Sequence, residues 1–128
     1  MDVLSLEESL FFAQRPEALA LYLPLREALL REAPGAEIQV KKTQISFRDR
    51  YIFAAVSFTP VRPAAKRPKH WLTLTLGLWY RPDSPRADAA SEPWPGRWTV
   101  HFLLGDAAEI DEELRTWIAQ AALFAREK

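Results

Sequence analysis

Polar side chains, most of them cationic or hydroxyl-bearing, recur at every second position in three segments of this chain. They are Lys42, Gln44, Ser46 and Arg48 in the first segment, Thr73 and Thr75 in the second, and Arg97, Thr99 and His101 in the third. Because alternate residues of a β-strand point to the same side, we expect these side chains to share one face of a sheet. Guanidinium groups flanked by hydroxyls hold a carboxylate or a phosphate, with Arg48 or Arg97 as the bidentate donor. The pattern therefore indicates a site for a small anionic ligand or a peptide.

The same pattern is also typical of a solvated sheet face that binds nothing, since threonine is common in strands for reasons of propensity alone. Trp71 and Trp79 fall on this face by alternation. Exposed aromatic side chains of this size indicate a binding surface, a contact between two copies of the chain, or a covering loop. The 81–95 segment, which contains Trp94, is a candidate for that loop.

No catalytic residue is assigned, because no constellation typical of an enzyme stands out. His101 has a side chain suited to acid–base chemistry, but no nucleophile motif accompanies it, and we interpret it as a hydrogen-bonded structural histidine. The chain has no cysteine and four glycines, which excludes thiolate chemistry and a glycine-rich phosphate loop. We therefore expect no cofactor, and an enzyme is the function class that the sequence favours least.

Acidic residues are concentrated between residues 106 and 113. Asp106, Glu109, Asp111 and Glu112 form an alternative site, because carboxylates bind iron or another hard cation weakly. Their spacing matches no calcium loop, and acidic residues are favoured in the first turn of a helix in any case. The dipole of a predicted helix explains most of this pattern.

Basic residues are concentrated in the segment 62–70, which contains Arg62, Lys66, Arg67 and Lys69. Such cations can contact phosphates, but a short charged loop is usually a solvated one. The chain as a whole has 17 basic and 17 acidic residues, so no overall field attracts it to nucleic acid or to an anionic membrane. We therefore expect no nucleic-acid partner and interpret the segment as a solvated loop.

Length and composition predict a single domain over residues 1–128. A chain of 128 residues with 48% hydrophobic residues can bury a core without disulfides or metals. The first twelve residues carry acids where a secretory signal would carry bases, and no apolar run is long enough to span a bilayer. We expect a cytoplasmic protein with no membrane partner.

Helices are predicted at both ends of the chain. Ser5 and Glu8 form a capping box that starts a first helix over about 6–14, and Pro16 suits the first turn of a second helix. The second helix carries a broad apolar stripe with Arg26 on its outer side and a kink at Pro24. Asp111 is the predicted N-cap of the last helix.

Strands are predicted in the middle of the chain, around residues 38–48, 51–58, 70–80 and 97–104, with loops over 59–69 and 81–95. Leucines 72, 74, 76 and 78 form one face of the third of these segments. The predicted fold class is α+β: an antiparallel sheet of four to five strands, with two N-terminal helices and one C-terminal helix packed on one face.

Three segments of the chain resemble a bacterial family of domains of unknown function, members of which are sometimes labelled "predicted transport protein". The most specific parts are Lys42, Thr43 and Phe47, and then His101 before the acidic helix start at Asp111 and Glu112. That family is distantly similar to YdhG-like α/β domains, some of which have been proposed as iron chaperones. The resemblance implies an α+β fold and no particular reaction.

Two further hypotheses stand beside a non-enzymatic binding module on the polar sheet face. In the first, the chain is an interaction module that forms a homodimer through its aromatic residues. In the second, it handles metal ions through the acidic residues 106–113. Its partner is accordingly a small anion, a protein or peptide, a second copy of itself, or a metal ion.

Overall fold

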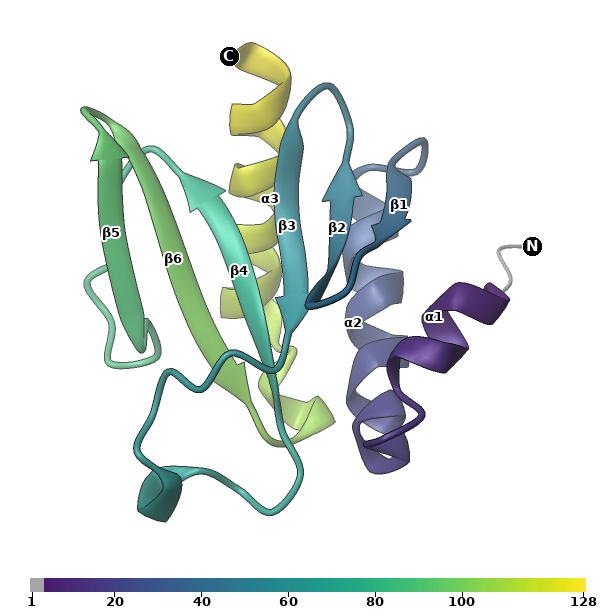
Figure 1. The fold of residues 1–128 in the computed structure, drawn as a ribbon. Helices are drawn as coiled ribbons and strands as arrows, with labels where there is room; N and C mark the ends of the chain where they lie inside the picture. Colours follow the sequence, from purple (N-terminus) through teal and green to yellow (C-terminus); the bar gives the residue numbers. More distant parts are fainter. Residues whose placement is uncertain (1–3) are drawn as a thin grey trace.

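The computed structural model describes residues 4–128 (Figure 1). Its three α-helices are α1 (Leu6–Phe11), α2 (Leu19–Glu32) and α3 (Glu112–Glu127), and three short 3-10 helices cover Pro16–Ala18, Ala64–Lys66 and Ala107–Glu109. Its strands are β1 (Glu37–Val40), β2 (Gln44–Arg48), β3 (Ile52–Ser57), β4 (Leu72–Leu78), β5 (Ala89–Trp94) and β6 (Arg97–Leu104). The α+β class predicted from the sequence is confirmed.

The sheet has six strands in the order β1-β2-β3-β4-β6-β5, and every pair of neighbours is antiparallel. The prediction of four to five strands was wrong because the segment 81–95, predicted as a loop, contains β5. This strand contains Pro93 and is mostly exposed, as an edge strand tolerates, and Gly96 with φ 75° makes the turn into β6.

The core lies between the sheet and the two long helices. Figure 1 shows α2 and α3 on the same side of the sheet, behind it in this view, and α1 beside β1. The leucines of β4 and the alternate residues Val100, Phe102 and Leu104 of β6 are buried on that side. Phe102 stacks on Trp117 of α3, with ring centroids 5.0 Å apart. The opposite face of the sheet, here called the open face, carries the other alternate residues of each strand.

A buried ion pair fastens α1 to α2. The Glu8 carboxylate accepts hydrogen bonds from the Tyr22 hydroxyl and from Arg26, whose Nε lies 2.7 Å away. Glu8 is 1% exposed and Arg26 is 8% exposed, so the prediction that Arg26 faces outward was wrong. Burial raises the pKa of Glu8, but the hydrogen bonds from Arg26, Tyr22 and Ser5 outweigh it and hold that pKa below its ordinary value.

The 59–71 loop is seated against the sheet by a second ion pair. Arg62 donates to Asp88 over 2.7 Å and to the Leu103 carbonyl over 3.1 Å, and Asp88 accepts from the Leu103 backbone N–H over 2.7 Å. Pro68 of the same loop lies against Gly105, where a Cβ would meet the proline ring at 2.3 Å. The loop therefore has a fixed position relative to β6.

Candidate functional site

One row of side chains crosses the open face of the sheet. The register pairs Ser46 with Ala55, Ala55 with Thr75, and Thr75 with His101. The Thr75 hydroxyl and the His101 Nδ1 lie 2.8 Å apart and form a hydrogen bond. The register thus confirms that three of the residues singled out in the sequence share one face.

Two of the predicted hydroxyls on this face are already occupied. The Ser46 hydroxyl accepts from the Gln44 side-chain amide over 2.8 Å, and the Thr73 hydroxyl donates to the Thr59 carbonyl over 2.7 Å. Both residues are 0% exposed. Ser46 and Thr73 are therefore buried, with hydroxyls that form hydrogen bonds within the sheet and to the adjoining loop.

His101 is held as a neutral side chain. Burial lowers its pKa below the ordinary value of 6.5, so the imidazole is uncharged at neutral pH. Its partner Thr75 carries a hydroxyl, but its other neighbour in the row is Ala89, which cannot orient an imidazole as a carboxylate does. The pair positions the Thr75 hydroxyl.

The sheet splits at one end, between its two central strands. Pairing of β3 with β4 runs from Ser57 and Thr73 to Ala54 and Leu76. Beyond that point β3 remains paired with β2, while Gly77 of β4 remains paired with β6. Figure 1 shows β4 leaning away from β3 here, with the last turns of α3 behind the opening.

A cleft of about 350 Å³ lies at this split. Its polar lining includes Gln44, Thr75 and Thr99 from the open face. Its apolar lining includes four aromatic rings, contributed by Phe53 of β3, Trp94 of β5, Trp98 of β6 and Phe124 of α3. A Cβ on Gly77 would meet no atom within 4 Å, so this glycine keeps the floor of the cleft open.

Two cations border the cleft: Arg97 at the start of β6 and Lys128 after α3. The Lys128 ammonium lies 5.0 Å from the Phe124 ring centroid. Burial and the neighbouring Arg97 guanidinium lower the pKa of Lys128 below its ordinary value. Within residues 4–128, neither cation forms an ion pair or a side-chain hydrogen bond. The cleft thus holds two uncompensated positive charges that repel one another.

Comparison with known protein families assigns the chain. A family model described as a domain of unknown function, DUF5655, matches residues 7–125. The chain belongs to this family. No curated protein and no solved structure matches it. The resemblance to a family of unknown function is confirmed, whereas the transport label and the YdhG-like similarity find no support in these comparisons.

Several predicted site residues of this DUF5655 domain lie away from the cleft. Lys42 is exposed in the turn between β1 and β2 and borders a different cavity, of about 670 Å³, beside α1. Arg48 is exposed at the end of β2, opposite Glu37 in register. Of the eight residues predicted to bind a ligand, the cleft is lined by Thr75, Arg97 and Thr99.

The two tryptophans predicted on the open face are placed differently. Trp71 is 8% exposed and packs against Phe58, so it is buried rather than displayed. Trp79 lies past the end of β4 and contacts Phe124 of α3, with ring centroids 5.8 Å apart. The alternation of β4 ends at Leu78, and Trp79 consequently leaves the open face.

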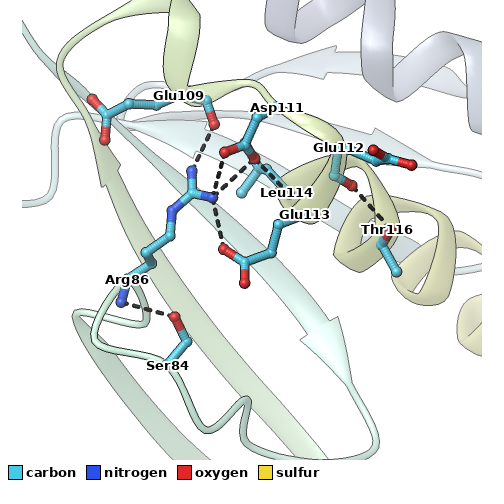
Figure 2. Close-up of polar contacts among 8 residues, drawn as sticks. All are labelled: Ser84, Arg86, Glu109, Asp111, Glu112, Glu113, Leu114 and Thr116. Carbon is cyan, nitrogen blue, oxygen red and sulfur yellow. Dashed lines mark hydrogen bonds and ion pairs between the residues drawn. The ribbon is translucent and has the colours of Figure 1, made fainter.

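The acidic residues 106–113 serve as helix caps and as partners of Arg86 (Figure 2). Asp106 caps the short helix Ala107–Glu109, the Glu109 side chain accepts from the Gly105 N–H, and Asp111 caps α3 as predicted. Arg86 donates to Asp111 and Glu113, each over 2.9 Å, and to the Glu109 carbonyl.

These carboxylates cap helices or pair with Arg86, and they do not surround a common position for a metal ion. The fourth predicted metal ligand is Glu112, whose carbonyl accepts from Thr116 in Figure 2. Across the part of the chain that the structure describes, no three His, Cys, Asp or Glu side chains are placed to hold a metal ion.

Among the same residues, no helix is both long and apolar enough to cross a membrane.

Reasoning from the sequence did not identify Lys128, Trp98 and Phe124 as residues of the cleft. Lys128 and Arg97 border the same cleft because of how α3 crosses the sheet, which spacing along the chain does not show. One signal was available: Gly77 interrupts a strand of leucines and threonines, and a glycine inside a strand often marks a bend or a place where a ligand approaches.

Proposed function

We propose that this DUF5655 domain is a non-enzymatic binding module that takes a small organic anion in the cleft between β3 and β4. The observation that carries the proposal is the pair of cations, Arg97 and Lys128, which face the cleft without an acidic partner within residues 4–128. An anion between them removes their repulsion and accepts charge-assisted hydrogen bonds from both. Burial of Lys128 strengthens this attraction, because screening by water is weaker there.

The size and lining of the cleft limit the ligand. A volume of about 350 Å³ is close to the lower end for small-molecule sites, so the ligand has about one ring or a short chain. Trp94, Trp98 and Phe124 suit an apolar or aromatic body, and the hydroxyls of Thr75 and Thr99 suit polar substituents on it. We therefore expect an aromatic or branched carboxylate.

The experiment is a thermal-shift and fluorescence titration with matched pairs of carboxylates and neutral amides. Benzoate is compared with benzamide, and indole-3-acetate with indole-3-acetamide. The carboxylates are expected to raise the melting temperature and to change tryptophan emission, since Trp94 and Trp98 line the cleft. The amides share the body and lack the charge, so any difference within a pair reports on the two cations.

Variants connect the binding to the cleft. Arg97→Gln and Lys128→Gln are each expected to raise the Kd about tenfold or more, the usual worth of a hydrogen bond to a charged group. Gly77→Val places a branched side chain at the floor of the cleft, where a Cβ meets no atom within 4 Å, and is expected to abolish binding. Arg115→Gln removes an exposed cation from α3 outside the cleft and is the control. Equal responses to acid and amide, or carboxylate binding that survives Gly77→Val, would refute the proposal.

Self-association is the second candidate, favoured by apolar side chains exposed around the same end of the sheet. Tyr51 is 42% exposed, Ile52 40%, Trp79 43% and Trp94 68%. Ile52 and Trp94 line the cleft, and Trp79 contacts its Phe124. A second copy seated there would cover these side chains together.

Light scattering at several protein concentrations tests this second candidate. Self-association predicts a mass that rises from the 14.7 kDa of one chain and returns to it in the Trp94→Ser variant. A constant mass of one chain removes the candidate and leaves the small-anion proposal intact.

A further inference from the structure

A second cluster of cations lies at the other end of β4. The segment between α1 and α2 contributes Gln14 and Arg15, and the loop before β4 contributes Arg67, Lys69 and His70. Together with Trp71 they line a pocket of about 330 Å³. Trp71 precedes β4 and Gly77 is near its end, so this pocket and the cleft are about 20 Å apart at the ordinary rise of a strand.

The Trp71 ring contacts the guanidinium groups of two of these cations. The guanidinium carbon of Arg15 lies 5.2 Å from the Trp71 ring centroid and 4.4 Å from that of Phe58. The guanidinium carbon of Arg67 lies 5.4 Å from the Trp71 ring centroid. Contact with an aromatic ring attracts a guanidinium and restricts its position, while its N–H groups stay available for a ligand.

The positive charges in this pocket exceed the negative charge that the protein places there. Among the residues that the structure describes, Arg15, Arg67 and Lys69 form no ion pair, although Glu17 also lines the pocket. The Arg67 Nε is buried and has no hydrogen-bond acceptor within 4–128. A buried donor left without a partner costs about 1–3 kcal/mol, and more when it is charged.

Arg62 of the same loop, in contrast, has its positive charge paired within the protein. Its side chain is matched by the Asp88 carboxylate and the Leu103 carbonyl. The loop thus contains one arginine that the fold satisfies and another, Arg67, that it leaves unsatisfied next to three further basic residues. Arg67 therefore keeps a guanidinium beside the pocket that no carboxylate of residues 4–128 binds, and an oxyanion in the pocket can accept hydrogen bonds from its outer N–H groups.

We propose that the pocket formed by Arg15, Arg67, Lys69 and His70 binds the phosphate group of a small phosphate monoester. A phosphate dianion accepts hydrogen bonds at three oxygens, and two guanidinium groups and an ammonium from different segments supply donors around it. The three permanent cations exceed the single charge of Glu17 by two, which matches the dianion. A pocket of about 330 Å³ has room for the phosphate and a short organic group attached to it.

The test is a calorimetric titration with inorganic phosphate and glycerol 3-phosphate. Wild type is expected to bind both saturably. Arg67→Gln and Arg15→Gln are expected to weaken binding about tenfold or more. Lys66→Gln, which removes the exposed cation next to Arg67 in the same loop, is the control and is expected to leave the Kd unchanged.

Melting of the Arg67→Met variant separates a binding role from a structural one. The variant lacks the unsatisfied donor, so without phosphate its melting temperature is expected to equal or exceed that of wild type. With phosphate present, wild type gains stability and the variant does not. The proposal is overturned if wild type shows no saturable binding up to on the order of 10 mM. It is also overturned if Lys66→Gln weakens binding as much as Arg67→Gln.

Discussion

Replacing Glu8 by glutamine tests how α1 is held to the rest of the domain. Glutamine at this position retains the capping box with Ser5, so the start of α1 is preserved. What is lost is the charge that faces Arg26 and Tyr22, in a site where the Glu8 and Arg26 side chains are 2% and 9% exposed. Removing one member of a buried ion pair costs about 3–5 kcal/mol.

The corresponding fall in melting temperature follows from the length of the chain. An unfolding entropy of about 2.1 cal/mol/K per residue gives about 270 cal/mol/K here, so each kcal/mol lowers the melting temperature by about 4 °C. Glu8→Gln is therefore expected to melt about 11–19 °C below wild type. Glu7→Gln, an exposed acid in the same turn, is the matched control and is expected to change stability by about 0.5 kcal/mol or less.

The assay is thermal and urea unfolding, followed by circular dichroism, of wild type and both variants. The pKa of Glu8 is lowered in the folded protein, so its contribution is present above its ordinary pKa of 4.5 and is lost as the pH falls through the folded value. The gap between wild type and Glu8→Gln should accordingly shrink in acid. A Glu8→Gln variant no less stable than Glu7→Gln would refute the reasoning.

Three further predictions concern the open face, the Arg86 cluster and the 59–71 loop. Burial lowers the pKa of His101, so the stability of the wild-type protein should fall as the pH drops below about 6.5 and level off below the pKa of the folded state. In a series of urea unfolding measurements at different pH, His101→Gln should flatten this pH dependence. An unchanged slope in the variant would contradict the prediction. Arg86→Gln should cost about 1 kcal/mol in melting experiments, because the Asp111 and Glu113 carboxylates it pairs with are about half exposed; no loss would show that water replaces it fully. Gly105→Ala places a methyl group against the Pro68 ring, so it should lower the free energy of unfolding by about 1–3 kcal/mol and make proteolysis of the 59–71 loop faster. A variant with the stability and the cleavage rate of the wild type would contradict this packing.

The strands that the sequence predicted well are those with a strong apolar alternation. The strand 97–104 has Trp98, Val100, Phe102 and Leu104 on one side, and β6 covers Arg97–Leu104. The segment that became β5 has no such alternation, because an edge strand with exposed residues on both sides has little to bury. Its pairing with β6 is set by the sharp turn at Gly96, a local feature that apolar alternation does not include.

For the site, the sequence predicted which side chains share a face of the sheet, because this depends only on the alternation of residues along each strand. Alternation placed Ser46, Thr75 and His101 on one face, as the register shows. It does not show that Ser46 is buried, because that depends on how neighbouring strands and loops pack. The approach of Lys128 to Arg97 is likewise a tertiary contact between distant segments, which one-dimensional spacing does not encode.

A titration of the 15N-labelled protein with indole-3-acetate, followed by ¹H–¹⁵N NMR, tests the anion cleft most directly. The account predicts saturable shifts in the backbone amides of Thr75, Gly77 and Thr99 and in the indole N–H signals of Trp94 and Trp98, all absent in Gly77→Val and with indole-3-acetamide. Unmoved signals at these positions, or equal shifts with the neutral amide, would contradict the claim that Arg97 and Lys128 hold an anion there.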